Sequence, residues 1–346
     1  MPRRQIPRSL REMSISNIAD NMNKVWSSDY REQYGSNQLR YIIGPFDCLD
    51  GDSVSRILER ICARRKMTRL YLQLLIVPNI SVLDLKMCNS LVNDALINVI
   101  ITRCVKLTNL NLANCNRVSS QKLAAIVLQF CKTLQTLDVS HTNFDDNTAK
   151  VVGQNCKVLS VLNISGSSRL SLAGIQSLFC IDSKQSNTKL TMFSKTVKIL
   201  HMWYCEADVN LVAKVLKSWS PQILRLSVDH FWKAIAIICE QSDSPLPLNL
   251  HGSKDMYLDT LSLLTNKSLP LMLQTVQNLK HLTLFTTSST HCDELFYVLS
   301  ILKSLTTFTV YWRLPFHFLK YVGACCSYIT KLDIQVSDIE EWSQHH

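Results

Sequence analysis

The stretch Leu107-Thr108-Asn109-Leu110-Asn111-Leu112 decides the fold, because its apolar pattern, Leu-x-x-Leu-x-Leu, recurs along the chain. We take the middle leucine of each occurrence as its anchor. The nine anchors are Leu83, Leu110, Leu137, Leu162, Leu200, Leu226, Leu282, Phe308 and Leu332. Successive anchors lie 24 to 27 residues apart, except for intervals of 38 residues after Leu162 and 56 after Leu226. A fixed period of this length predicts a repeat architecture, in which each unit packs on its neighbours.

The cysteines give an independent register for the same repeat. Seven of the 13 cysteines fall in two fixed columns. The column six residues before an anchor contains Cys104, Cys131, Cys156 and Cys326, and the column five residues after it contains Cys88, Cys115 and Cys205. Thr142 and Ser167 occupy the second column in the remaining early units. Small thiol or hydroxyl side chains suit a place where the chain turns off a strand, because they can bond backbone groups there.

Between the predicted strands, apolar residues recur at spacings of three and four, which predicts helices over 94–103 and 120–130. Asp145 and Ser171 are good N-cap residues for the next two helices. One strand and one helix in about 26 residues matches a leucine-rich repeat. The units resemble the cysteine-containing class of these repeats, found in many F-box substrate receptors. Over roughly residues 78–340, this resemblance implies an α/β leucine-rich-repeat solenoid, a horseshoe with its strands on the concave face.

We expect two parts in the chain. Residues 1–66 do not fit the repeat and form an N-terminal helical region, and residues 67–346 form the solenoid. Two stretches of the solenoid are irregular. Within 180–197, a polar loop starting at Ile181 lengthens one unit, and 240–270 contains a degenerate repeat whose strand is best placed at Leu248-Asn249-Leu250.

The N-terminal region begins with a predicted helix. Ser9-Leu10-Arg11-Glu12 has the form of a capping box, in which Ser9 caps the helix and Glu12 reaches back to it. One stripe of that helix contains Leu10, Ser14 and Ile18, with Met13 and Met22 alongside. A second helix is expected from near Asp52.

The first helix resembles a known docking motif. The spacing Ser9-Leu10-x-x-x-Ser14-x-x-x-Ile18 is similar to the BC box, by which substrate receptors of cullin-2 and cullin-5 ubiquitin ligases bind elongin C. The resemblance implies that Leu10 enters an apolar pocket of elongin C. Ser14 would lie at the close-packed point, where the motif usually has cysteine. Pro45-Phe46 is similar to a cullin-2 box, and the order of these parts resembles the Zyg-11 family without its armadillo repeats. The candidate adaptor-binding residues are therefore Ser9, Leu10, Ser14, Ile18, Pro45 and Phe46, with elongin B/C and a cullin as implied partners.

Two alternatives stay open for this region. The helices could simply cap the open end of the solenoid, which needs a cover over its core. Alternatively, residues 39–75 could contain a diverged F-box, in which case the adaptor would be Skp1.

The sequence contains no motif that predicts catalysis. It has no Gly-rich phosphate loop, no Gly-x-Ser-x-Gly, no His-Glu-x-x-His and no Cys-x-x-Cys, so we expect neither an enzyme nor a metal or other cofactor. The net charge of +10 comes from scattered residues, with Arg64-Arg65-Lys66 as the densest run, and no nucleic-acid motif accompanies it.

The sequence also gives an expected location. It has no run of 18 apolar residues, which predicts no membrane-spanning segment. The N-terminus, Met1-Pro2-Arg3-Arg4-Gln5, does not resemble a secretory signal. We therefore expect reduced cysteines and a cytoplasmic or nuclear protein, or one found in both places.

The exposed strand face is the candidate target-binding surface. Side chains one and three residues after each anchor point to the same side of a strand. Aromatic residues gather there in the later repeats, and such residues often anchor interfaces. The candidate partner-binding residues are His201, Trp203, Tyr204, Asp229, Phe285, Tyr311 and Trp312. The alternative is that the irregular late repeats bury these rings.

These patterns favour a substrate-recognition subunit of a cullin-RING E3 ubiquitin ligase. Such a protein would dock its adaptor through the N-terminal helices and its target through the strand face. The alternative is a leucine-rich-repeat scaffold or signalling adaptor with no ligase role. The identity of the target and the oligomeric state do not follow from the sequence.

Overall fold

The computed structural model describes residues 9–28, 32, 45–181, 189–219, 222–228, 231–241, 253–257, 278–285, 299–311 and 316–335. The chain divides into two compact units, Met1–Thr196 and Val197–His346. Each unit is described by itself below. Within the described residues, no helix combines the length and apolar character needed to cross a membrane.

The first unit opens with helices. Helix α1 spans Leu10–Asp20 and is followed by a turn of π-helix, then by α3, Gly51–Ala63, and α4, Arg69–Leu75. The prediction of a helix from near Asp52 is confirmed. The helical region continues past the expected boundary at residue 66, because Thr68 caps a further helix, α4, whose leucines are buried.

Four parallel strands follow in the first unit, one from each repeat. They are β1 Val82–Asp84, β2 Asn109–Asn111, β3 Thr136–Asp138 and β4 Val161–Asn163. The register pairs Leu83 with Leu110, Leu110 with Leu137, and Leu137 with Leu162, so the predicted anchors lie side by side. All four anchors are buried, while the residues on either side of each are at least partly exposed. The predicted repeat register is confirmed.

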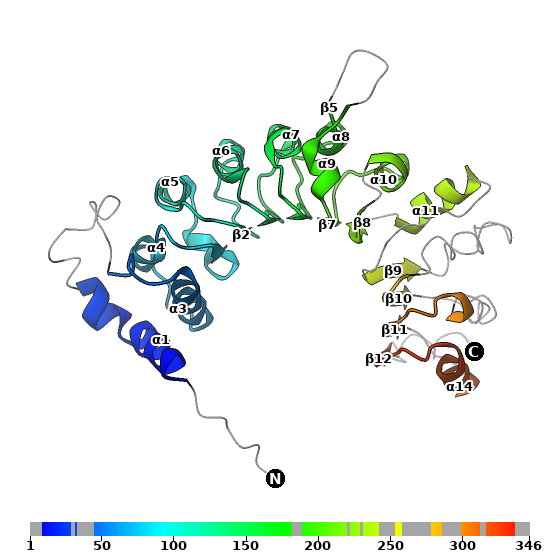
Figure 1. Cartoon of the computed structure of the whole chain (residues 1–346), viewed down its shortest axis with the longest axis horizontal. Helices are drawn as coiled ribbons and strands as arrows, with labels where there is room; N and C mark the ends of the chain where they lie inside the picture. Colours follow the sequence, from blue (N-terminus) through cyan, green and yellow to red (C-terminus); the bar gives the residue numbers. More distant parts are fainter. Residues whose placement is uncertain are drawn as a thin grey trace, which may run out of the picture. The chain divides into compact units, whose positions relative to one another are not determined.

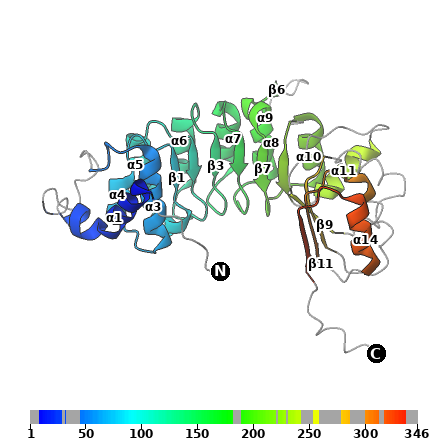
Figure 2. The same ribbon diagram turned by 60° about the horizontal axis from the view of Figure 1, so that its bottom comes forward.

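Each strand is followed by a helix on the other side of the unit, as Figures 1 and 2 show. These helices are α5 Asp94–Arg103, α6 Ser120–Phe130, α7 Asp146–Asn155 and α8 Leu172–Phe179. A side-chain oxygen caps each of them, from Asn93, Ser119, Asp145 and Ser171 respectively. Such a cap satisfies one of the free N–H groups at a helix start.

The column after each strand acts as predicted in the turn, except at Ser167, whose buried hydroxyl has no hydrogen-bond partner within the described residues. The Cys88 thiol donates to the carbonyl of Leu85 at 3.5 Å, and the Thr142 hydroxyl donates to the carbonyl of Val139 at 2.6 Å. Cys115 contacts a turn carbonyl in the same way. Cys205 is only half-buried, whereas Cys88 and Cys115 are buried.

The lengthened unit is more ordered than a polar loop. Strand β5, Cys180–Ile181, pairs antiparallel with β6, Lys189–Leu190, and a short helix, α9, Met192–Thr196, follows. Phe193 of α9 is buried, with its ring 6.0 Å from that of Phe179. The polar composition of the segment hid this packing, and the expectation of a simple loop is corrected accordingly.

The second unit contains the remaining described repeats. Its strands are β7 Ile199–Met202, β8 Arg225–Val228, β9 Ser253–Tyr257, β10 His281–Phe285, β11 Thr307–Tyr311 and β12 Lys331–Gln335. Its helices are α10 Val209–Lys214, α11 Phe231–Glu240 and α14 Phe316–Cys325. Strands β7 and β8 are parallel, and β9 to β12 form a parallel sheet in chain order.

The degenerate repeat has its strand at β9, which pairs with β10. The predicted strand at 248–250 lies outside the described residues. The sequence did not predict β9 itself, because Ser253–Tyr257 lacks the full apolar pattern of the other strands.

Candidate protein-interaction surfaces

Helix α1 has two apolar faces. Ile15 and Ala19 are buried against the rest of the chain. On the opposite face, Leu10 is 79% exposed and Met13 is 56% exposed, with Ser14 exposed beside them. A surface helix normally has one apolar stripe facing its core. The outer face of α1 is therefore an apolar surface that the described residues do not cover.

The predicted stripe is only partly on that outer face. Leu10 and Ser14 are exposed, whereas Ile18 is half-buried at the edge of the face. Met22, expected alongside, is 2% exposed and belongs to the core. Met13, the other residue expected alongside the stripe, is exposed next to Leu10. We refer to Leu10, Met13 and Ser14 as the outer face of α1.

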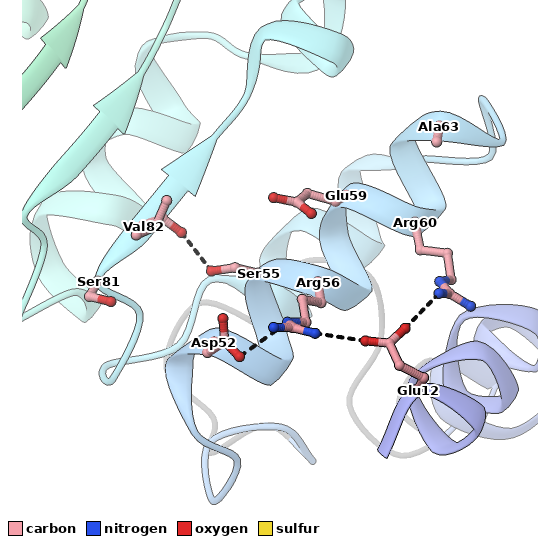
Figure 3. Close-up of a pocket in the computed structure, with 9 residues that line it drawn as sticks. All are labelled: Glu12, Asp52, Ser55, Arg56, Glu59, Arg60, Ala63, Ser81 and Val82. Atoms are coloured by element: carbon pink, nitrogen blue, oxygen red, sulfur yellow. Dashed lines mark hydrogen bonds and ion pairs between the residues drawn. The ribbon is translucent and has the colours of Figure 1, made fainter. Parts of the chain in front are cut away.

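Charged pairs fix α1 on α3. Arg11 lies 2.8 Å from a carboxylate oxygen of Asp50 and 2.9 Å from one of Asp52. Glu12 joins Arg56 at 2.7 Å and Arg60 at 2.9 Å, as Figure 3 shows. The expected capping box is therefore half correct. The Ser9 hydroxyl accepts from the Glu12 N–H, but both Glu12 carboxylate oxygens bind arginines of α3.

A hollow of about 640 Å³ lies beside these pairs, between α1, α3 and β1. Of its five charged side chains, Glu12, Asp52, Arg56 and Arg60 form a chain of ion pairs, and Glu59 lines the hollow beside them (Figure 3). The Ser55 hydroxyl donates to the Val82 carbonyl at 2.7 Å, which covers part of the free edge of β1. The hollow thus lies where the N-terminal helices meet the first repeat.

The second predicted docking element lies mostly inside the protein. Phe46 is 1% exposed, with its ring 5.5 Å from that of Trp26, and Pro45 is half-buried. Arg103 clamps the same segment with two hydrogen bonds to Asp47, of 2.9 and 3.0 Å. Phe46 is a core residue of this chain, and its side chain is not available to a partner in this conformation.

A ladder of polar side chains lines the strand face of the first unit, and sequence reasoning missed it. One residue after each anchor stands Asp84, Asn111, Asp138 or Asn163. Asn111 donates to Asp84 at 3.2 Å, and Asn163 donates to Asp138 at 3.0 Å. The other carboxylate oxygen of each aspartate, and the amide oxygen of each asparagine, accepts the backbone N–H of the residue two positions later. The alternation of acid and amide in the sequence was the signal.

The candidate partner-binding residues fall in the second unit, and three of them can be placed. The His201 imidazole lies 2.9 Å from the Ser227 hydroxyl across β7 and β8. Trp203 is half-buried, and Tyr204 is 78% exposed. Phe285 and Tyr311 end strands β10 and β11, but their side chains, and the whole of Asp229 and Trp312, lie outside the described residues.

Three thiols of the first unit are shielded from reaction by burial. Burial raises the pKa of the Cys104, Cys115 and Cys156 thiols to about 12. No cysteine among the described residues forms a disulfide. In the same part of the chain, no three His, Cys, Asp or Glu side chains come together as metal ligands would.

Comparison with known proteins agrees with this architecture. A chain in the crystal structure of the Rad7 and Elc1 complex from yeast has a TM-score of 0.53 and 13% identity, over 95% of this chain and 87% of that chain. The leucine-rich repeat-containing protein LegL7 from Legionella pneumophila has a TM-score of 0.45 and 17% identity, over 74% of this chain and 83% of that chain. No family model and no curated protein matches the sequence. By its fold, the chain is an α/β leucine-rich-repeat solenoid.

Proposed function

We propose that this protein is a substrate-recognition subunit of a cullin-RING E3 ubiquitin ligase. In this proposal the outer face of α1 binds elongin C, which brings elongin B and a cullin. The strand face of the later repeats binds the target protein. The observation that carries the proposal is the exposure of Leu10, at 79%, on a helix whose other face is fixed to the chain.

The exposure of Leu10 favours docking over simple capping. A helix that only covered the end of the solenoid would bury its apolar stripe against the first repeats. Here Ile15 and Ala19 already pack against the chain, while Leu10 and Met13 are exposed to solvent. Burying a leucine side chain against a partner contributes about 1.5–3 kcal/mol, so these two residues could supply much of a modest interface.

The ion pairs support docking as well. They hold α1 in one orientation on α3 through Arg11 and Glu12, so the outer face is presented before a partner arrives. A preorganised face loses less conformational entropy on binding. The fold likeness to a chain from the Rad7 and Elc1 complex agrees with a role in a protein assembly.

Target binding is proposed for the Trp203–Tyr204 corner of the second unit. Tyr204 has a φ of 57°, a left-handed backbone that bulky residues rarely adopt, and its ring is exposed. Exposed aromatic residues are typical of interaction sites. His201 lies on the same strand segment. We propose a role in binding, not catalysis, for this corner, and a cytoplasmic or nuclear location for the protein.

Affinity purification tests the proposal. The tagged chain is expressed in a eukaryotic cell line, and co-purifying proteins are identified by mass spectrometry. Elongin B, elongin C and a cullin should be recovered with the unchanged chain and lost with Leu10→Ala. The matched control is Leu128→Ala, because Leu128 is also an exposed helical leucine, at 53%.

Two other outcomes of this purification would support the alternative functions. Recovery of Skp1 in place of the elongins would identify residues 39–75 as a diverged F-box. Recovery of neither adaptor would favour a leucine-rich-repeat scaffold with no ligase role.

A further inference from the structure

The turn between α3 and α4 concentrates positive charge at the surface. Arg64, Arg65, Lys66 and Arg69 fall within six residues, and all four are exposed. Arg64 forms an ion pair with Asp20 at the end of α1. Within the described residues, the side chains of Arg65, Lys66 and Arg69 have no hydrogen-bond or ion-pair partner. The proposed docking and target-binding surfaces do not use this turn.

Thr68 presents a hydroxyl group at the end of this basic run. Its backbone is extended, with φ −125° and ψ 165°, and its side chain is exposed. The hydroxyl oxygen accepts a long hydrogen bond, 3.3 Å, from the Tyr71 N–H. Arg65 stands three residues before Thr68, and Lys66 two before. Protein kinases that prefer basic substrates select cations at these two places. In the structure Arg65 has a left-handed backbone, with φ 55°, in the turn that ends α3, so this segment has to extend on entering a kinase cleft.

We propose that Thr68 is a phosphorylation site for a basophilic serine/threonine kinase. The kinase and ATP are the co-reactants. The Thr68 oxygen forms a bond to the γ-phosphorus of ATP, the bond from that phosphorus to the β,γ-bridging oxygen breaks, and ADP leaves. The hydroxyl proton passes to the catalytic carboxylate of the kinase.

The structure selects Thr68 among three Arg-x-x-Ser/Thr sequences in the chain. The others are Arg11-x-x-Ser14 and Arg117-x-x-Ser120. Ser14 lies inside α1, where its hydroxyl donates to the Leu10 carbonyl at 3.0 Å and Arg11 is held by two aspartates.

Ser120 is no better placed than Ser14. It is the first residue of α6 and only partly exposed, and Arg117 donates to the Ser90 carbonyl at 3.0 Å. Thr68 alone combines an extended backbone, an exposed hydroxyl and unpaired cations on its N-terminal side.

Phosphorylation would change the charge of this turn substantially. A phosphate group carries about −1.5 to −2 charges at neutral pH, so it offsets roughly two of the four cations around it. The phosphorylated threonine can still accept the Tyr71 N–H bond, so α4 need not unfold. The two forms would therefore present different charges to a partner on the same backbone. This proposal does not depend on the ligase proposal.

Phosphate incorporation tests the site. The purified full chain is incubated with ATP and the catalytic subunit of cAMP-dependent protein kinase, and the modified residue is mapped by mass spectrometry. Phosphate should appear on Thr68, be lost in Thr68→Val, and persist in Thr68→Ser. Arg65→Gln should sharply slow incorporation, whereas the matched change Arg117→Gln should leave it unaltered. Melting curves for every variant exclude unfolding as the cause.

The proposal fails if no phosphate reaches Thr68 in the folded chain. It also fails if Ser14 or Ser120 is modified first, or if Arg65→Gln and Arg117→Gln slow the reaction equally.

Discussion

At the scale of the residue, four residues in equivalent places of the repeat share a left-handed backbone conformation. Asn114, His141, Gly166 and Tyr204 each stand four residues after an anchor, with φ between 53° and 69°. Asparagine and glycine tolerate this conformation, whereas it costs a bulky residue roughly 1–2 kcal/mol. Asn114 and His141 each donate their N–H to the next repeat, to Ser140 and Ser165. The turn geometry of the repeat imposes this strained backbone conformation. Tyr204 adopts it, and its ring is exposed.

Gly166 should be intolerant of a side chain. An added Cβ would lie 2.2 Å from the His141 ring nitrogen Nδ1, and the φ of 69° would be strained as well. Gly166→Ala should lower the free energy of unfolding by about 1–2 kcal/mol, measured by chemical denaturation. Gly323→Ala is the control, because nothing lies within 4 Å of its added Cβ in helix α14. The control should be neutral or stabilising, and equal losses in both variants would contradict the account.

The cysteines should differ widely in reactivity. Cys48 is exposed, whereas Cys104, Cys115 and Cys156 are buried and their pKa is raised to about 12. Because the thiolate is the reactive form, iodoacetamide at pH 8 should alkylate Cys48 well before those three. Peptide mass spectrometry after a short pulse measures the order.

A reducing agent should leave the melting temperature unchanged, and a large drop on reduction would reveal a structural disulfide.

At the scale of the element, period and register were predictable because they depend on local pattern. Anchors such as Leu110 repeat at a spacing that fixes which residues face the core, and the observed strand pairing follows it. The β5–β6 hairpin and α4 were not predictable in this way. The same holds for the packing of α9 on α8, where Phe193 contacts Phe179, because the two residues have no periodic relation.

The acid–amide ladder should depend on its alternation. Asn111→Asp would remove the bond to Asp84 and place a carboxylate between Asp84 and Asp138 on neighbouring strands. Like charges directly opposite one another destabilise a sheet. The variant should lose about 1 kcal/mol at pH 7, and this loss should shrink as the pH falls towards about 4, where carboxylates become protonated.

Asn109→Asp is the matched control for this ladder. Asn109 lies on the same strand, but its cross-strand neighbours are Val82 and Thr136, so a carboxylate there meets no acidic partner. Chemical denaturation of both variants across this pH range makes the comparison. A loss in Asn111→Asp that does not depend on pH would argue against charge repulsion.

At the scale of the whole chain, the repeat fold was predictable but the candidate site was predictable only in part. The spacing of Leu10 and Ser14 indicated a stripe, and both residues are exposed. Phe46 matched a docking pattern equally well, yet it lies in the core. A short sequence motif does not show which of its apolar residues are buried in the protein's own core. Exposure decides that, and it depends on contacts between α1, α3 and the first repeat.

The central claim is that α1 packs against the rest of the chain with one face and binds a partner protein with the other. Calorimetric titration of purified elongin B–elongin C into the chain, with a thermal melt of each variant, tests it most directly. Leu10→Ala should leave the melting temperature unchanged and weaken binding by about 2 kcal/mol, the value of one buried leucine. Ile15→Ala should lower the melting temperature, because Ile15 is 3% exposed. Leu128→Ala should bind like the unchanged protein. The claim is contradicted if Leu10→Ala binds with full affinity, or if it destabilises the chain as much as Ile15→Ala does.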